Sequence, residues 1–105
     1  MPTTPSSFNK QSYEEFSIEV KFDKQMDSSE TITDQTVTAT LNDVDVSSGI
    51  IADSEISGQS IIVGVKGGAD GSDYKITIKI VTDAALPDGS YSKYESDILM
   101  LVRNE

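Results

Sequence analysis

Apolar residues alternate with polar ones in several separate segments of the chain. The clearest segment is 73–82, where Tyr74, Ile76, Ile78 and Ile80 occupy every second position. Successive side chains of a strand point to opposite faces, so this spacing predicts a strand with one buried and one wet face. The same alternation predicts further strands at 16–22, 32–41, 60–66 and 94–103.

The last of these segments has apolar residues on both faces. Ile98, Met100 and Val102 share one face, and Leu99 and Leu101 share the other. A strand of this kind lies inside a sheet or is covered by another subunit. Both interpretations stay open at this point.

The strand signals define the fold class. Residues 42–60 are the least regular stretch, with short strands expected around Val44–Val46 and Gly49–Ile56, and no window has a sustained helical period. Strands at intervals of about ten residues predict an all-β, immunoglobulin-like sandwich of about seven antiparallel strands. The chain has no cysteine, so the sandwich carries no disulfide. We expect residues 1–12, rich in Pro, Ser and Thr, to form a flexible arm, and residues 13–105 to form the domain.

Composition removes most catalytic chemistry. The chain has no His and no Cys, so it lacks the usual general base, the commonest metal ligand and a thiolate nucleophile. The adjacent Glu14 and Glu15 would point to opposite faces of a strand and cannot act as a carboxylate pair. We therefore expect a protein that is not an enzyme and that uses no cofactor and no metal.

The charge balance and the hydropathy pattern bear on partners. A net charge of −10, from 18 acidic and 8 basic residues, disfavours binding to nucleic acid or to an anionic membrane. The longest apolar run, Ile98–Val102, is far shorter than a membrane helix requires. The first residues lack a basic region followed by an apolar one, so the sequence predicts a cytoplasmic start rather than secretion.

Two groups of turn residues could be taken for ligand sites. Asp70 and Asp73 do not have the spacing of an EF-hand, which favours turn residues over a calcium site. Gly67, Gly68 and Gly71 precede a strand rather than a helix, so they predict a turn rather than a phosphate-binding loop.

Three further features concern packing and contacts. Tyr74, placed shortly after the glycine-rich turn, is expected to form a tyrosine corner in which its hydroxyl bonds the backbone upstream. Tyr91 and Tyr94 lie in and beside a turn, where they form either a contact patch or ordinary packing at the edge of the sandwich. A threonine-rich strand face suits a half-exposed surface and is a candidate for interactions; its residues are Thr36, Thr38 and Thr40.

Several motifs occur in an order that resembles a known family. The strand ending at Lys66 is followed by Gly67-Gly68-x-x-Gly71-x-x-Tyr74 and a threonine-containing strand, and the chain ends shortly after Val102-Arg103. Upstream are an aromatic-Asp pair, Phe22-Asp23, and the step Glu30-Thr31-Ile32-Thr33. Over residues 20–105 this set resembles small immunoglobulin-like proteins of tailed phages and prophages, described as fibre-to-tail adaptors. The family usually has two Trp residues that this chain lacks, and the hairpin at 84–92 is longer here.

The resemblance implies a structural protein of a phage tail or fibre that acts through contacts with other tail and fibre components, with a homo-oligomer as one option. It implies a location in the virion, reached from the host cytoplasm. A competing resemblance concerns Val20–Asp27, which is similar to the opening of bacterial immunoglobulin-like repeats. That alternative implies a stalk or adhesion module of a cell-surface or secreted protein.

Overall fold

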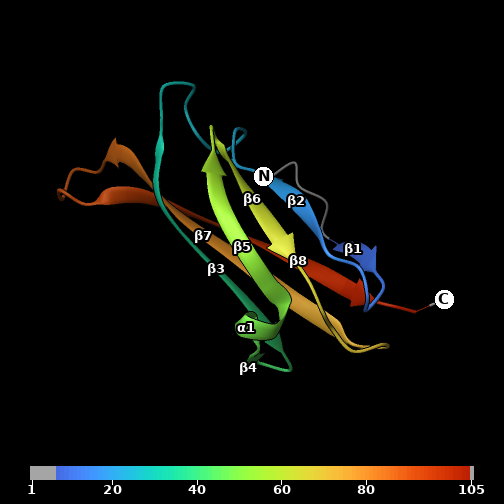
Figure 1. Cartoon of the computed structure of the whole chain (residues 1–105). Coiled ribbons are helices and arrows are strands. Elements are labelled where there is room, and N and C mark those ends of the chain that lie inside the picture. The colour runs from blue at the N-terminus through green and yellow to red at the C-terminus, as the bar shows by residue number, and fades with distance from the viewer. Residues whose placement is uncertain (1–6, 105) are drawn as a thin grey trace.

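Two β-sheets stacked face to face make up the protein (Figure 1). The computed structural model describes residues 7–104. The larger sheet has five strands in the order β1-β8-β7-β3-β4, and the smaller sheet has three in the order β2-β6-β5. The elements are β1 (Ser7–Lys10), β2 (Phe16–Lys21), β3 (Ile32–Leu41), β4 (Val44–Asp45), α1 (Ser47–Ile50), β5 (Ile51–Ser57), β6 (Ser60–Val65), β7 (Asp73–Ala85) and β8 (Tyr91–Val102).

The inner faces of the two sheets form the core. On β7 the alternating residues Tyr74, Ile76, Ile78 and Ile80 are at most 5% exposed. Opposite them lie buried side chains of the smaller sheet and of the segments beside it; these are Val20, Phe22, Ile61, Val63 and Val65. Each such side chain contributes about 1.5–3 kcal/mol when fully buried. The expected all-β, immunoglobulin-like sandwich is therefore confirmed in its class and in its two sheets.

The first described strand differs from the expected arm. Residues 7–10 form β1, which pairs in parallel with β8 from Ser7 opposite Leu99 to Lys10 opposite Val102. The alternation signal fails here because the strand has only four residues and its partner lies at the other end of the chain. Residues 7–104 thus form eight strands where about seven were expected, and the pair β1–β8 is parallel whereas every pair was expected to be antiparallel. Residues 1–6 of the predicted arm lie outside the described residues.

The irregular stretch from 42 to 60 contains two short strands and one helical turn. Asn42 and Asp43 both have positive φ, 51° and 66°, and join β3 to β4 with Leu41 opposite Val44. A two-residue hairpin turn of this kind requires positive φ at both positions, which Asn and Asp adopt more readily than other residues with a Cβ. The four-residue α1 follows, and residues 7–104 contain no helix that is long and apolar enough to cross a membrane.

The hairpin of β7 and β8 is the longest feature of the fold. Its turn projects beyond the smaller sheet, at the far left of Figure 1, and the molecule measures 49 × 24 × 21 Å. Over residues 99–102 the strand β8 lies between β1 and β7, so its apolar residues on two faces belong to an interior strand. Leu99 on the outer face is still 44% exposed.

The turn between β6 and β7 is held by Tyr74. Its hydroxyl accepts a hydrogen bond of 2.9 Å from the backbone N–H of Ala69, five residues upstream. This is the contact that a tyrosine corner requires. The side chain itself is buried, with 5% exposed.

Replacing Tyr74 with phenylalanine tests this contact. The variant keeps the ring but leaves the Ala69 N–H without the hydroxyl, so we expect a loss of about 1 kcal/mol in unfolding free energy and a fall of about 4–8 °C in Tm. Thermal unfolding followed by circular dichroism measures the change. Tyr13→Phe is the matched control because Tyr13 is 96% exposed. An equal Tm for the two variants would show that the Tyr74 hydroxyl does not stabilise the turn.

Candidate interaction surface

The outer face of the five-stranded sheet carries the three predicted threonines. Thr36, Thr38 and Thr40 point away from the core on β3, and Thr36 is exposed while the other two are half-buried. Across the strands Thr36 pairs with Lys79, Thr38 with Thr77 and Thr40 with Lys75. We call this surface the threonine face; its residues are Thr36, Thr38, Thr40, Lys75, Thr77, Lys79, Glu95, Asp97 and Leu99.

A shallow groove crosses this face at right angles to the strands. It has a volume of about 410 Å³ and its walls are two rows of side chains. The rows follow the strand register and are Asp34, Val81 and Lys93 on one side and Thr36, Lys79 and Glu95 on the other. The floor is the backbone of Gln35, Ile80 and Tyr94, whose own side chains point inward. We call this hollow the cross-strand groove.

The acidic and basic side chains that line the cross-strand groove balance each other in charge. Its walls hold two acidic and two basic side chains, whereas the whole chain has a net charge of −10. Nearby, the Lys75 ammonium lies 3.9 Å from the Asp97 carboxylate, and the Thr77 hydroxyl donates a 2.8 Å hydrogen bond to the same carboxylate. Exposed pairs of this kind add little stability, so these side chains remain free to exchange partners.

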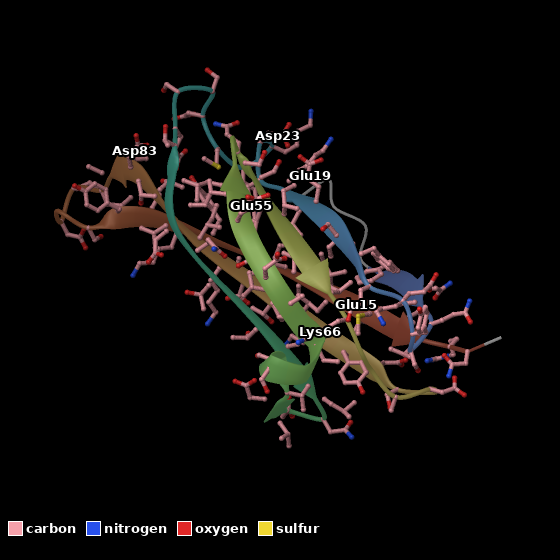
Figure 2. The ribbon with its side chains drawn as sticks, in the orientation of Figure 1. Glu15, Glu19, Asp23, Glu55, Lys66 and Asp83 are labelled. Carbon is pink, nitrogen blue, oxygen red and sulfur yellow. The ribbon has the colours of Figure 1, made fainter. Side chains whose placement is uncertain are left out.

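The opposite outer surface has a different character. On the three-stranded sheet the outward positions of β2 and β5 include Glu19, Asp53 and Glu55, all exposed. Figure 2 shows Glu19 and Glu55 on the side toward the viewer, with Asp23 close to the end of the same sheet. The two broad surfaces of the sandwich therefore differ in chemistry, one mixed and hydroxyl-rich and the other acidic.

The sequence also places the chain among known proteins. The model of one protein family matches residues 10–88, about three quarters of the chain, and that family is described as podophage GP4 fiber-tail adaptor protein gp77. The chain belongs to this gp77 adaptor family. The predicted resemblance to fibre-to-tail adaptors is thereby confirmed, and the protein is a structural component of a phage tail. No curated protein matches the sequence.

The match to the gp77 family covers two of the three strands that form the threonine face, β3 and β7. It includes all of β2 to β7, and it ends in the turn before β8. Thr36, Thr38 and Thr40 lie within the matched part, whereas Tyr91 and Tyr94 lie beyond it. The match favours a phage protein over the bacterial surface module that Val20–Asp27 brought into consideration.

The two candidate tyrosines of this gp77 family member have different surroundings. Tyr91 is 51% exposed near the hairpin turn, beside a hollow of about 290 Å³ lined by Thr33, Thr82 and Asp83. Tyr94 is half-buried, and its hydroxyl donates a 3.4 Å hydrogen bond to the Glu30 carboxylate. The structure does not bring them into one patch, because residues three positions apart on a strand point to opposite faces.

Burial changes the acid–base behaviour of Tyr94. Loss of hydration is the largest effect and raises the pKa of its hydroxyl, and the Glu30 carboxylate raises this pKa further. Glu30 is itself buried, accepts hydrogen bonds from the Thr82 hydroxyl and from the Asp27 N–H at 3.0 Å, and joins the loop before β3 to β7. These groups hold the inner side of the groove floor in place.

The aspartates that could suggest a metal site have structural partners. The Asp70 carboxylate accepts a 2.8 Å hydrogen bond from the backbone N–H of Asn104, and the Asp73 carboxylate forms a 2.8 Å ion pair with Arg103. Residues 7–104 contain no group of three or more metal-ligating side chains. The turn glycines have positive φ, namely 63° at Gly67, 96° at Gly68 and 84° at Gly71.

Sequence reasoning missed two exposed residues that shape the surfaces and one buried lysine. Leu86, at the hairpin turn, is 44% exposed, and its position beside Pro87 in a polar turn is the signal that could have marked it. Tyr13 is 96% exposed between β1 and β2. Lys10 is only 2% exposed, and no local pattern predicts a buried lysine. The exposed side chains of Leu86 and Tyr13 are of the apolar and aromatic kinds that mark protein interfaces.

Proposed function

We propose that this chain is a non-enzymatic adaptor that joins components of a phage tail to its fibre through the threonine face. In this proposal it works inside the virion, after assembly from the host cytoplasm, and every contact it makes is non-covalent. Membership of the gp77 adaptor family supports the tail role. The cross-strand groove, with its balanced charges on an otherwise acidic chain, supports the choice of surface.

The side chains of the threonine face suit a protein partner. Threonine is β-branched and already restricted at χ1 on a strand, so it loses little conformational freedom when a partner covers it. Its hydroxyl both donates and accepts hydrogen bonds. Leu99, 44% exposed on the same face, supplies apolar surface. A polypeptide that crosses the strands can therefore bury the methyl groups while it bonds the hydroxyls.

The charges of the cross-strand groove also favour a polypeptide over a nucleic acid. A nucleic acid binds through Lys and Arg side chains that are free to neutralise its phosphates, and its affinity rises with the number of phosphates neutralised. Here Lys79 pairs across the strands with Glu95, and Lys93 lies in the same row as Asp34. A partner with both signs of charge complements this pattern, and a polyanion does not.

Substitution at the centre of the surface tests this proposal. Thr36→Glu adds bulk and charge to the wall of the cross-strand groove while placing a carboxylate opposite Lys79, so folding should change by less than about 0.5 kcal/mol. We expect particles assembled with this variant to carry at least about tenfold fewer fibres, since a tenfold loss of affinity needs only about 1.4 kcal/mol. Fibre content is measured on purified particles by quantitative mass spectrometry and electron microscopy.

The control introduces a glutamate on the other broad surface, that of the three-stranded sheet. Ser17→Glu lies at an exposed outward position of β2, opposite Gly64. We expect particles made with this variant to carry a normal number of fibres. Normal fibre content with Thr36→Glu, or an equal loss with both variants, would remove the threonine face as the adaptor surface.

A further inference from the structure

Among residues 7–104, one edge of the larger sheet has no partner strand along most of β8. In the described part of the chain, β1 pairs with β8 from Leu99 to Val102. Within residues 7–104, no strand pairs with Tyr91–Ile98 on the side away from β7. An open edge presents backbone groups that can pair with another strand.

Hydrogen bonds at the end of β8 show which residues face this edge. The Arg103 N–H donates to the Lys10 carbonyl at 2.9 Å, toward β1, whereas the Val102 N–H donates to the Ser72 carbonyl at 3.0 Å, toward β7. The register between β7 and β8 continues without a shift from Asp73 opposite Leu101 to Val81 opposite Lys93. Backbone groups alternate sides along a strand. The N–H and C=O groups of Lys93, Glu95 and Asp97 therefore point out of the open edge.

The sequence along this edge is self-complementary. It runs Ser92-Lys93-Tyr94-Glu95-Ser96, so an antiparallel copy centred on Tyr94 places serine opposite serine and lysine opposite glutamate. Lys93 and Glu95 are both exposed and lie on the same outer face. Opposite charges at directly facing positions stabilise a strand pair by about 0.2–1 kcal/mol relative to alanine.

Backbone geometry selects among the registers. With Tyr94 at the centre, Lys93 faces Glu95 of the second copy, and since both point their backbone groups outward, each such pair forms two hydrogen bonds. A shift of one residue would place outward-pointing groups opposite inward-pointing ones. A register centred on Glu95 satisfies the backbone but sets Glu95 against Glu95, which is destabilising. The register centred on Glu95 also sets Lys93 against Asp97, but of these two registers the one centred on Tyr94 alone avoids a like-charge pair.

We propose that two copies of this chain pair through the open edges of their β8 strands, antiparallel and centred on Tyr94. The paired region runs from Tyr91 to Asp97, and it leaves out the segment Leu99–Val102 that β1 pairs with in residues 7–104. One sheet then runs through both copies, and the two threonine faces lie on the same side of it. This inference does not depend on the adaptor surface proposed above.

Charge reversal tests both the dimer and its register. Sedimentation equilibrium of the full chain should give twice the monomer mass. Lys93→Glu and Glu95→Lys should each weaken dimerisation at least about tenfold, because each sets like charges opposite each other at two symmetric positions. The double variant Lys93→Glu/Glu95→Lys should restore it, since the opposed charges are again complementary. Circular dichroism melting checks that every variant is folded, as Glu95 also pairs with Lys79 within the chain.

A second measurement does not depend on substitution. Amide hydrogen exchange at Lys93 and Glu95 should slow as the concentration of the unaltered chain rises, while exchange at exposed Glu19 stays constant. A chain that remains monomeric at high concentration overturns the proposal. Recovery of the dimer by Lys93→Glu/Asp97→Lys instead of by the double variant above would overturn the register.

Discussion

Replacing Gly68 with alanine is expected to destabilise the protein by about 3–5 kcal/mol, from backbone strain and a steric overlap together. Gly68 has a φ of 96°, which residues with a Cβ rarely adopt. A Cβ there would lie 2.7 Å from Val102 Cγ2 and 3.3 Å from Tyr74 Cε2. Both neighbours are buried core residues and have little room to move. Urea unfolding of the purified variant measures the change.

Gly71 in the same turn separates the two contributions. Its φ is 84°, but a Cβ there would meet no atom within 4 Å. Gly71→Ala should therefore carry only the backbone strain and cost about 1–2 kcal/mol. Equal losses for the two variants would contradict the steric explanation, and a loss below about 1 kcal/mol at Gly68 would show that the turn can rearrange.

Replacing Lys10 with methionine is the second substitution with a large expected effect, about 2–3 kcal/mol of lost stability at neutral pH. The Lys10 ammonium donates to the carbonyl of Gly67 at 2.6 Å and to that of Gln11 at 2.8 Å, and contacts that of Ser12 at 3.4 Å. Methionine fills the space of the stem but leaves these carbonyls without their donor. Lys24→Met, at an exposed position, is the control and should change stability by less than about 0.5 kcal/mol.

The same substitution has an expected pH dependence. Burial is the largest effect on Lys10 and lowers its pKa below 10.5, against the opposing charges of Glu14 and Glu15. Between the folded and the unfolded pKa the unfolded chain binds more protons, so the stability contributed by Lys10 rises with pH in that window. The difference in unfolding free energy between the unaltered chain and Lys10→Met should therefore grow as the pH rises toward 10.5. A difference that shrinks would show that the folded state retains the proton more tightly.

Much of the fold follows from local alternation. The face of Tyr74, Ile76, Ile78 and Ile80 was predictable because period-two spacing of large apolar residues has one structural meaning. Expected strand boundaries were close to the observed ones, although β2 ends at Lys21 and leaves the buried Phe22 in the following turn. A buried side chain beyond a strand end continues the alternation and so extends the predicted strand.

Long-range pairing and surface shape were beyond local patterns. Lys10 is buried because β1 brings it beside Val102, and no neighbouring residue signals a contact across more than 90 positions. The cross-strand groove depends on the register of β3, β7 and β8, which the turns and a shift after Ile32 determine. The three threonines could be named in advance, but the residues of β7 that pair with them across the strands could not.

The parallel pairing of β1 and β8 has a mechanical consequence. A force that pulls Ser7 and Val102 apart along the strands acts in shear, because the two residues lie at opposite ends of the paired segment. All the hydrogen bonds between the strands then carry the load together, rather than opening one after another as in a zipper. Tension applied in this direction therefore loads the strand pair in shear and does not unzip it.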